Sequence, residues 1–284
     1  TQICSKLIGG NEHKTLTTEG GAYFSPKWSP NGDQLAFYTN DGGRVSIKVM
    51  PAYGGKQREL FESKAQVAAL SWSPDGKNIA YVDRDTISNQ HAIYLYNFAN
   101  KHSTKLTNPP RNHWGDSSPR FSKDGQKVAF IRTLDEGMQD LFLIDIEQKA
   151  SNQLTEISSN VFGFDWINDS GFVFSSDYDG QVALWELDPN KSQFIQKLPL
   201  GRDKRNPTIS GTNLIMEEWN TDTDLIYLNL NDQNIKPYAL IRSTFWDLNP
   251  DIAQNGKKLA FASNQSGNYE IWTSNANGSG LKKI

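Results

Sequence analysis

One pattern recurs six times along the chain, and it constrains the fold more than any other feature. Residues 26–32 (PKWSPNG), 70–76 (LSWSPDG) and 119–125 (PRFSKDG) each place a bulky ring before a turn that ends in glycine. The bulky position returns every 43 to 49 residues, at Trp28, Trp72, Phe121, Trp166, Ile209 and Ile252. A fixed period of this length is typical of repeat architectures, in which each unit packs on its neighbours.

Three further positions repeat with the same period. An apolar triplet follows each turn, as at residues 35–37 and 79–81. A later alternating segment is marked by Ile3, Ile47, Ile93, Leu141, Leu184, Ile226 and Ile271. A last position reads Leu16, Leu60, Leu106, Leu154, Leu198, Leu240 and Ile284, and several of these residues precede a threonine.

These positions predict four short strands in each unit, named A to D in chain order. A tight turn joins A to B, and its Asn-Gly or Asp-Gly pair supplies positive φ angles. We expect strand A to begin with proline, as at Pro26 and Pro119, because a first residue need not donate to the ladder. Strand C alternates apolar and polar residues at 92–96 and 140–144, which points successive side chains to opposite faces. No segment sustains a 3.6-residue apolar period, so the fold is predicted to be all β.

A four-stranded unit of this length cannot bury both of its faces alone. Arranged around an axis, each sheet packs on its two neighbours and only the rims stay open. We therefore predict one domain over residues 1–284, an all-β six-bladed β-propeller of four-stranded antiparallel blades. A β-helix needs much shorter repeats, and an immunoglobulin tandem needs about 100 residues per unit.

Composition narrows the class of partner. Lys plus Arg number 29 and Asp plus Glu number 32, giving a net charge of −3. This balance argues against a nucleic-acid-binding domain, which is usually strongly basic. No apolar run approaches the ~18 residues of a membrane span, so we expect membrane contact only through an anchor outside these residues. Cys4 is the only cysteine, which excludes an internal disulfide.

The repeat resembles that of a known family. Residues 261–272 (FASNQSGNYEIW), residues 72–76 (WSPDG) and the Leu-Thr endings are similar to the repeat of TolB-like propellers, which also occurs in prolyl-oligopeptidase-type proteins. The likeness covers almost the whole chain, although units four and five have lost the regular turn at 166–171 and 210–213. It implies the fold, and it leaves function open because this propeller serves as scaffold, sensor and peptidase gate.

The repeats also bear on how the ring closes. Strands A and B occur six times, but C and D occur seven times, with the extra pair around Ile3 and Leu16. We expect the N-terminal strand to complete the sixth blade, since propellers commonly close by joining the two chain ends. A seven-bladed ring is the alternative, with its remaining strands beyond the residues given. We also expect the chain to be part of a longer polypeptide.

Motifs for catalysis are not found in the sequence. It has no Gly-x-Ser-x-Gly elbow and no phosphate-binding glycine loop, and its four histidines form no zinc motif. The pairs Asp177/Asp179 and Asp222/Asp224 could offer oxygens to Ca²⁺, but both fit ordinary acidic turns better. We expect no catalytic residue, no metal and no cofactor.

Binding residues are expected where the D-to-A loops and B-to-C turns meet around the channel mouth, because loops on a rigid scaffold carry function. Aromatic and arginine side chains, which are enriched at interfaces, gather in these loops. The candidates are Tyr23, Phe24, Arg111, His113, Trp114, Asp116, Arg202, Asp203, Arg205, Phe245, Trp246 and Asp247. Loop aromatics can also cap the blades, which is the alternative interpretation. Trp28, Trp72 and Trp166 are instead assigned to the core between blades.

The function predicted from these residues and the resemblance is a non-enzymatic binding, sensor or scaffold propeller. Its partner is a protein, a peptide or a small ligand at the channel mouth. The resemblance implies a periplasmic or otherwise extracytoplasmic setting, including the sensor segment of a membrane-anchored transcriptional regulator. The alternative is the gating propeller of a prolyl-oligopeptidase-like peptidase whose catalytic domain lies elsewhere. A propeller lyase or lactonase is less consistent with the sequence, which lacks a histidine-rich channel.

Overall fold

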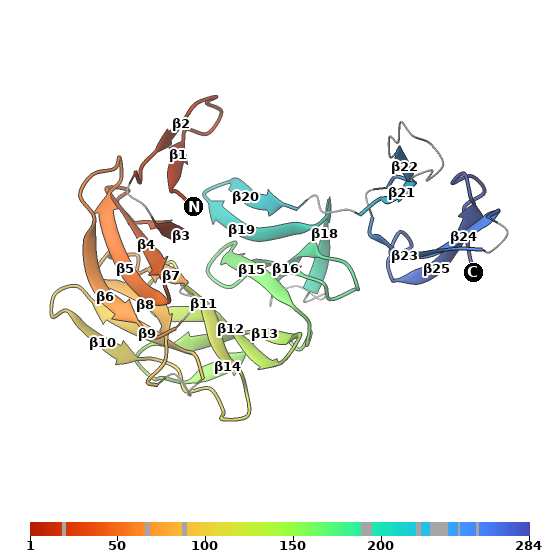
Figure 1. The fold of residues 1–284 in the computed structure, drawn as a ribbon. Coiled ribbons are helices and arrows are strands. Elements are labelled where there is room, and N and C mark those ends of the chain that lie inside the picture. The colour runs from red at the N-terminus through yellow and green to blue at the C-terminus, as the bar shows by residue number, and fades with distance from the viewer. Residues whose placement is uncertain are drawn as a thin grey trace.

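The computed structural model describes residues 1–18, 21–65, 69–86, 90–188, 195–219, 223–227, 238–243, 245–253 and 256–284. Their secondary structure consists of strands and turns (Figure 1). In these ranges we find no helix long and apolar enough to cross a membrane.

Five four-stranded antiparallel sheets, each meandering from strand A to strand D, dominate the described residues. Unit one contains β3 (Ala22–Trp28), β4 (Gln34–Asp41), β5 (Arg44–Pro51) and β6 (Arg58–Ser63). Unit two contains β7 (Leu70–Trp72), β8 (Asn78–Asp83), β9 (Ala92–Asn97) and β10 (His102–Lys105). Unit three contains β11 (Gly115–Phe121), β12 (Lys127–Asp135), β13 (Met138–Asp145) and β14 (Ser151–Gln153). Unit four contains β15 (Val161–Trp166), β16 (Phe172–Ser176), β17 (Ala183–Leu187) and β18 (Ile195–Arg202).

The remaining strands complete the row of units. Unit six is the fifth four-stranded sheet, with β23 (Asp247–Ile252), β24 (Lys258–Ser263), β25 (Glu270–Asn275) and β26 (Lys282–Lys283). Unit five consists of two separate hairpins, β19 (Lys204–Ser210) with β20 (Asn213–Glu218), and β21 (Leu225–Tyr227) with β22 (Tyr238–Ile241). An N-terminal hairpin pairs β1 (Cys4–Lys6) with β2 (His13–Thr15). The prediction of an all-β propeller with four-stranded antiparallel blades is confirmed.

The core lies between consecutive units, as radial packing requires. One buried apolar cluster joins units one and two, another joins two and three, and a third joins three and four. Ile3 and Leu16 of the N-terminal hairpin are buried against Tyr23 and Phe37 of unit one. Units one to four are therefore joined in sequence by shared apolar cores.

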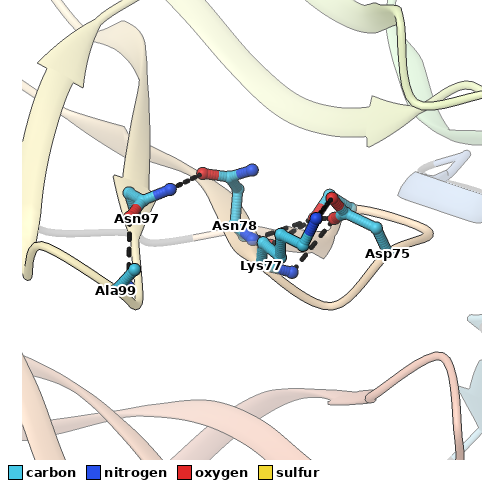
Figure 2. A network of polar contacts seen from close by, with 6 residues as sticks. Asp75, Lys77, Asn78, Asn97 and Ala99 are labelled. Carbon is cyan, nitrogen blue, oxygen red and sulfur yellow. Dashed lines mark hydrogen bonds and ion pairs between the residues drawn. The ribbon is translucent and has the colours of Figure 1, made fainter.

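A serine-centred turn joins strands A and B and explains the recurring spacing of the Ser-Pro-Asp-Gly segment. In unit two, Ser73 Oγ donates to Asp75 Oδ1 at 2.6 Å and accepts from the Asn78 backbone N–H at 2.9 Å. The bond from Ser73 Oγ, together with one from the Lys77 backbone N–H at 3.0 Å, lowers the pKa of Asp75. Figure 2 shows the adjacent contact, in which Asn97 Nδ2 donates to Asn78 Oδ1 at 2.9 Å. Units one and three build the same turn.

The repeated threonines act within the ladder between strands C and D. In three places the threonine hydroxyl accepts a hydrogen bond of 2.9 Å from the backbone N–H of the marker residue in strand C. The pairs are Ile3 with Thr17, Ile93 with Thr107, and Leu141 with Thr155. The threonine hydroxyl thereby provides an acceptor for a buried backbone N–H of strand C at the point where strand D ends.

The prolines of strand A lie inside the strand, so the expectation that they start it is wrong. Strand A extends further toward the N-terminus and reaches each proline through a β-bulge. The residue before each proline has a positive φ, at Ser25, Ser118, Asn206 and Asn249. A bulge leaves one residue outside the ladder, which lets proline occupy the strand interior.

Two tryptophans of the repeat column fasten units two and four to the unit that precedes each. Trp72 Nε1 donates to the Lys27 carbonyl at 3.1 Å, and Trp166 Nε1 donates to the Arg120 carbonyl at 3.4 Å. The core assignment is confirmed for Trp72 and Trp166 and is wrong for Trp28, which is 52% exposed. In the described structure, no preceding four-stranded unit packs against the strand that carries Trp28.

The two ends of the row lie apart in Figure 1, where β1–β2 and β23–β25 occupy opposite sides. The edge of β24 is already paired with β25, and β1 pairs with β2. The expected completion of the sixth blade by the N-terminal strand is therefore not confirmed, and neither is the number of blades. The N-terminal hairpin instead packs on unit one as a C–D pair.

Candidate functional site: the rim cavity

A cavity of about 360 Å³ opens where units four, five and six meet. Unit four contributes strand β15 and the turn after β16, unit five contributes the start of β19 and the residue before it, and unit six contributes the loop before β23 and the turn after β24. The residues that line this rim cavity are Phe162, Asp177, Gly180, Gln181, Val182, Asp203, Arg205, Trp246, Asn264 and Tyr269. Three of the twelve predicted binding residues, Asp203, Arg205 and Trp246, are thus brought together.

Arg205 is held between two aromatic rings. Its guanidinium carbon lies 4.3 Å from the ring centre of Phe162 and 4.6 Å from that of Trp219. Trp219 is itself fixed, since its Nε1 donates to Glu217 Oε2 at 2.8 Å. Arg205 Nε is buried and has no hydrogen-bond partner among the described residues. The rings orient the guanidinium and leave donor capacity for a further group.

Asp203 links units four and five through its backbone. Its N–H donates to the Val182 carbonyl at 2.7 Å, and its carbonyl accepts from the Trp219 N–H at 2.9 Å. The backbone of Asp203 has φ = +55°, a left-handed conformation that is unfavourable for residues other than glycine. Residues with such strained backbones are found often at functional sites. The half-buried carboxylate lines the cavity next to the arginine.

Asp177 forms part of the wall through satisfied contacts. Its two carboxylate oxygens accept from the backbone N–H of Asn160 at 3.0 Å and from Asn160 Nδ2 at 2.7 Å. These bonds stabilise the turn that also presents Gln181. Of the aspartate pairs weighed as calcium ligands, Asp222 lies outside the described residues. Within the described ranges, no three acidic, histidine or cysteine side chains converge on a metal-sized site.

Trp246 and Tyr269 supply the apolar side of the cavity. Trp246 is 41% exposed, and its backbone N–H is fixed to Asn264 Oδ1 at 2.9 Å. Tyr269 is about half exposed beside the turn after β24. Partly exposed rings on a pinned backbone can bury an apolar anchor at little conformational cost.

The lining therefore combines an oriented guanidinium, two carboxylates, two side-chain amides and three aromatic rings. This composition is suited to recognition, because charges select polar groups around an apolar anchor. The described lining residues do not include a hydroxyl–imidazole or thiol–imidazole pair of the kind used in covalent catalysis.

Four of the predicted rim residues are structural. Tyr23 is buried in the core beside Phe37, with ring centres 5.7 Å apart, and Phe24 stacks on Tyr38 at 5.1 Å. Their assignment to a binding rim is wrong, because strand A begins before them and turns them into the blade interface.

Asp116 and Asp247, which were expected among the binding residues, are both buried. Asp116 is fully buried and accepts from Arg132 Nε at 2.7 Å and Nη2 at 2.9 Å. Asp247 accepts from Ser243 Oγ at 2.8 Å. Both lie in the first two residues of a strand A, where the neighbouring strand or the preceding loop supplies a hydrogen-bond donor to the carboxylate.

The other candidates lie away from the cavity or outside the described side chains. Arg111 and Trp114 are exposed in the loop before β11, and half-buried His113 lies between them. Phe245 precedes Trp246 and accepts through its carbonyl from the Thr223 N–H at 3.2 Å. The side chain of Arg202 lies outside the described residues. The loop before β11 thus remains a separate exposed patch.

Sequence reasoning missed Phe162, Trp219, Gln181 and Tyr269. Gln181, Trp219 and Tyr269 belong to B-to-C connections, which were expected on the same face as the D-to-A loops. Their position in the repeat was therefore the available signal, and Trp219 also lies outside the repeat column of bulky residues. Phe162 carries no such signal, because only the packing of β15 beside β19 places it near Arg205.

Comparisons with known proteins identify relatives. A family model described as the TolB beta propeller domain matches residues 46–284. Dipeptidyl-peptidase 5 of Porphyromonas gingivalis is 30% identical over 130 residues, covering 42% of this chain and 19% of that protein. The Tol-Pal system protein TolB of Francisella tularensis subsp. holarctica is 30% identical over 105 residues, covering 37% of this chain and 24% of that protein.

A solved structure shows the same fold. TolB from Acinetobacter baumannii superposes with a TM-score of 0.57 at 18% identity, covering 87% of this chain and 62% of that chain. The matched region spans a quarter or less of the two curated relatives.

Proposed function

The chain belongs to the TolB β-propeller domain family, and we propose that it is a non-catalytic binding module whose rim cavity holds a protein or peptide partner. The name of the Francisella relative places that protein in a Tol-Pal system, which favours a role in assembly over chemistry. The propeller supplies a rigid frame, and the loops of three units supply the contacts.

The observation that carries this proposal is the position of Arg205. Its guanidinium is pre-oriented by Phe162 and Trp219, its Nε is buried without a described partner, and it opens into the cavity beside exposed Trp246. Tryptophan and arginine are the side chains that most often dominate binding energy at interfaces. The proposed partner segment inserts an apolar anchor against Trp246 and offers an acceptor to Arg205.

A peptide selection tests this function. Random peptides displayed on phage would be selected on the purified chain and counter-selected on the Trp246→Ala variant. We expect enriched peptides with an apolar anchor flanked by an acidic residue, which compete with one another for one site. Enrichment of peptides that bind the variant equally well would overturn the proposal.

We also propose an extracytoplasmic setting for the domain, with a sensor or scaffold role in a longer, membrane-anchored protein. The family membership and the TolB relative support this setting. Fractionation of cells that express the full reading frame tests it, and recovery of the protein only from the cytoplasm would contradict it.

A second candidate is the gating propeller of a serine peptidase. It is favoured by the 30% identity to dipeptidyl-peptidase 5. A downstream Gly-x-Ser-x-Gly unit in the full reading frame would select this function, since the nucleophile must come from outside the propeller.

The six-bladed ring remains part of the proposal. Six A–B hairpins support that count, and the half-exposed Trp28 supports a closing contact. By analogy with Trp72 and Lys27, Trp28 would donate to the carbonyl of Asp251 in a closed ring. The N-terminal hairpin would then cover the junction, or would belong to a seventh blade.

A further inference from the structure

The surroundings of Arg205 in the rim cavity match those of Arg132 in unit three. The guanidinium carbon of Arg132 lies 5.3 Å from the ring centre of Phe130 and 4.7 Å from that of Phe142. Contact with these rings leaves the edge of the guanidinium that carries Nε and Nη2 for hydrogen bonding. Asp116 occupies this edge, because its two carboxylate oxygens accept from Nε at 2.7 Å and from Nη2 at 2.9 Å. The buried pair shows which acceptor suits a guanidinium held in this way.

Arg205 has the same kind of aromatic neighbours but no carboxylate at the corresponding edge. Its guanidinium carbon lies 4.3 Å from the ring centre of Phe162 and 4.6 Å from that of Trp219. Its Nε is buried without a hydrogen-bond partner, and the side chain forms no ion pair within the described ranges. A charged donor that is buried and unpaired is unfavourable. An acceptor supplied by a ligand would remove this cost.

Three nearby carboxylates do not neutralise Arg205 directly. Glu217 lies opposite it in the ladder of β19 and β20, but Glu217 Oε2 accepts from Trp219 Nε1 at 2.8 Å. The two oxygens of Asp177 accept hydrogen bonds from one asparagine across the cavity wall. Asp203 lies two residues before Arg205 and lines the same cavity, yet the described structure contains no ion pair between them. The edge of the guanidinium is therefore open to a ligand.

The carboxylate of Asp203 is a second unpaired group on the same wall. Its backbone is tied to units four and five, whereas its half-buried side chain forms no hydrogen bond with a described residue. A ligand that matches both groups carries a carboxylate for Arg205 and an N–H for Asp203, close together. The last residue of a polypeptide has this pair, because its free carboxylate and its backbone N–H are attached to the same carbon.

The size and the boundary of the cavity also favour a chain end. Its volume of about 360 Å³ lies at the lower end of the range of about 300–1,000 Å³ in which proteins enclose small ligands. The B-to-C turns of units four and six meet at one side. A methyl group at Gly267 would lie 3.1 Å from Gln181 Nε2, and one at Gly180 would lie 3.0 Å from Asn268 Oδ1. The cavity is bounded there, so a chain end fits it better than a segment that passes through.

We propose that the rim cavity binds the free C-terminus of a peptide or protein. The terminal carboxylate accepts from the Nε–Nη2 edge of Arg205, as Asp116 does from Arg132, and the N–H of the same residue donates to Asp203. The terminal side chain is apolar and packs on the partly exposed rings of Trp246 and Tyr269. This inference rests on the proposed function, since it names the part of the partner that enters the cavity.

Matched synthetic peptides test the requirement for a chain end on the unsubstituted chain. The probes are acetylated pentapeptides that end in phenylalanine, leucine or valine, each made as the free acid and as the C-terminal amide. A third set is amidated and carries an aspartate beside the apolar residue. Calorimetric titration should show that the best free acid binds at least tenfold more tightly than its amide. The aspartyl amides, whose carboxylate lies on a side chain, should bind more weakly than the free acids.

Variants identify the groups that bind the chain end. Arg205→Gln should lower the affinity for the free acids at least tenfold and leave the amides unchanged. Arg205→Lys keeps the charge without the planar fork, so it should recover only part of the preference for acids. Methylation of the last peptide nitrogen, which removes the donor to Asp203, should weaken the free acids several-fold. Arg58→Gln, at an exposed arginine, should bind like the parent.

The outcomes separate this inference from the proposed function. Equal affinity of acids and amides, or a preference for acids that survives Arg205→Gln, would overturn binding of a chain end. The proposed function would still stand if peptides from the phage selection bind in a manner that depends on Trp246. Failure of every free acid to bind would also overturn the inference, and failure of the selected peptides as well would overturn both.

Discussion

The indole Nε1 of Trp72 donates a hydrogen bond to the backbone carbonyl of Lys27, 3.1 Å away in the preceding unit. The same indole stacks on Phe98 with ring centres 5.1 Å apart and planes tilted by 8°. One side chain thus packs in the core beside its own unit and fixes the backbone of strand A in the preceding unit. The tryptophan at this repeat position therefore both packs in the core and holds two neighbouring units in register.

The first prediction contrasts this residue with an exposed tryptophan. Trp72→Ala should lower the free energy of unfolding by about 3–5 kcal/mol, since it empties a core position and removes the inter-unit bond. Trp114→Ala should change it by less than about 0.5 kcal/mol, because that ring is 59% exposed. Urea unfolding of both variants measures the difference, and equal losses would show that Trp114 caps the blades.

The second prediction concerns the N-terminal hairpin. Removing residues 1–17 deletes buried Ile3 and Leu16 and uncovers Tyr23 and Phe37 of unit one. The truncated chain should melt at a markedly lower temperature and aggregate, because a blade face and a strand edge are exposed. Light scattering during a thermal melt checks this. An unchanged, cooperative melt of a monomer would contradict it.

The third prediction follows from the pKa of Lys27, lowered to about 7 from an unfolded value of 10.5. Between these values the unfolded chain binds more protons, so stability should rise with pH, whereas below about 7 the full penalty applies. Relative to Lys27→Met, the parent chain should gain about 1–2 kcal/mol between pH 7 and 9 in phosphate-free buffer, partial exposure reducing the effect. Lys56→Met is the control, and parallel pH profiles for parent and Lys27→Met would disprove the shift.

The fourth prediction tests the buried pair of Asp116 and Arg132. Arg132→Met alone should cost about 3–5 kcal/mol, because it leaves a buried carboxylate unpaired. Adding Asp116→Leu should recover most of that loss, since well-packed apolar residues can replace a buried ion pair. Unfolding of the two single variants and the double variant measures the coupling. A double variant as unstable as the sum of the singles would indicate independent roles.

The sequence predicted the fold from features that the period makes visible. The Ser-Pro-Asp-Gly turns, the alternating third strands and the threonine endings each correspond to a local hydrogen-bond arrangement. The proline of strand A was misplaced because a bulge at positive φ, as at Ser25, is not encoded by residue periodicity. Trp28 was misassigned because its burial depends on a neighbouring unit rather than on its own.

The site was predicted less completely than the fold. Arg205 and Trp246 were found because loop aromatics and arginines are unusual. Asp116 was misjudged because nothing in the sequence pairs it with Arg132, which lies opposite on the next strand. Phe162 could not be assigned, since it approaches Arg205 only after strands from different units pack together.

The central claim is that the rim cavity binds a partner through Arg205 and Trp246. Its most direct test is the affinity of one selected peptide for the parent chain, Arg205→Gln, Trp246→Ala and the exposed control Tyr53→Ala, measured beside their melting temperatures. We predict that the two cavity variants lose about 1–3 kcal/mol of binding free energy each, as interface anchors do, with little change in melting. Tyr53→Ala should bind like the parent. Parent-like affinity in both cavity variants would contradict the account.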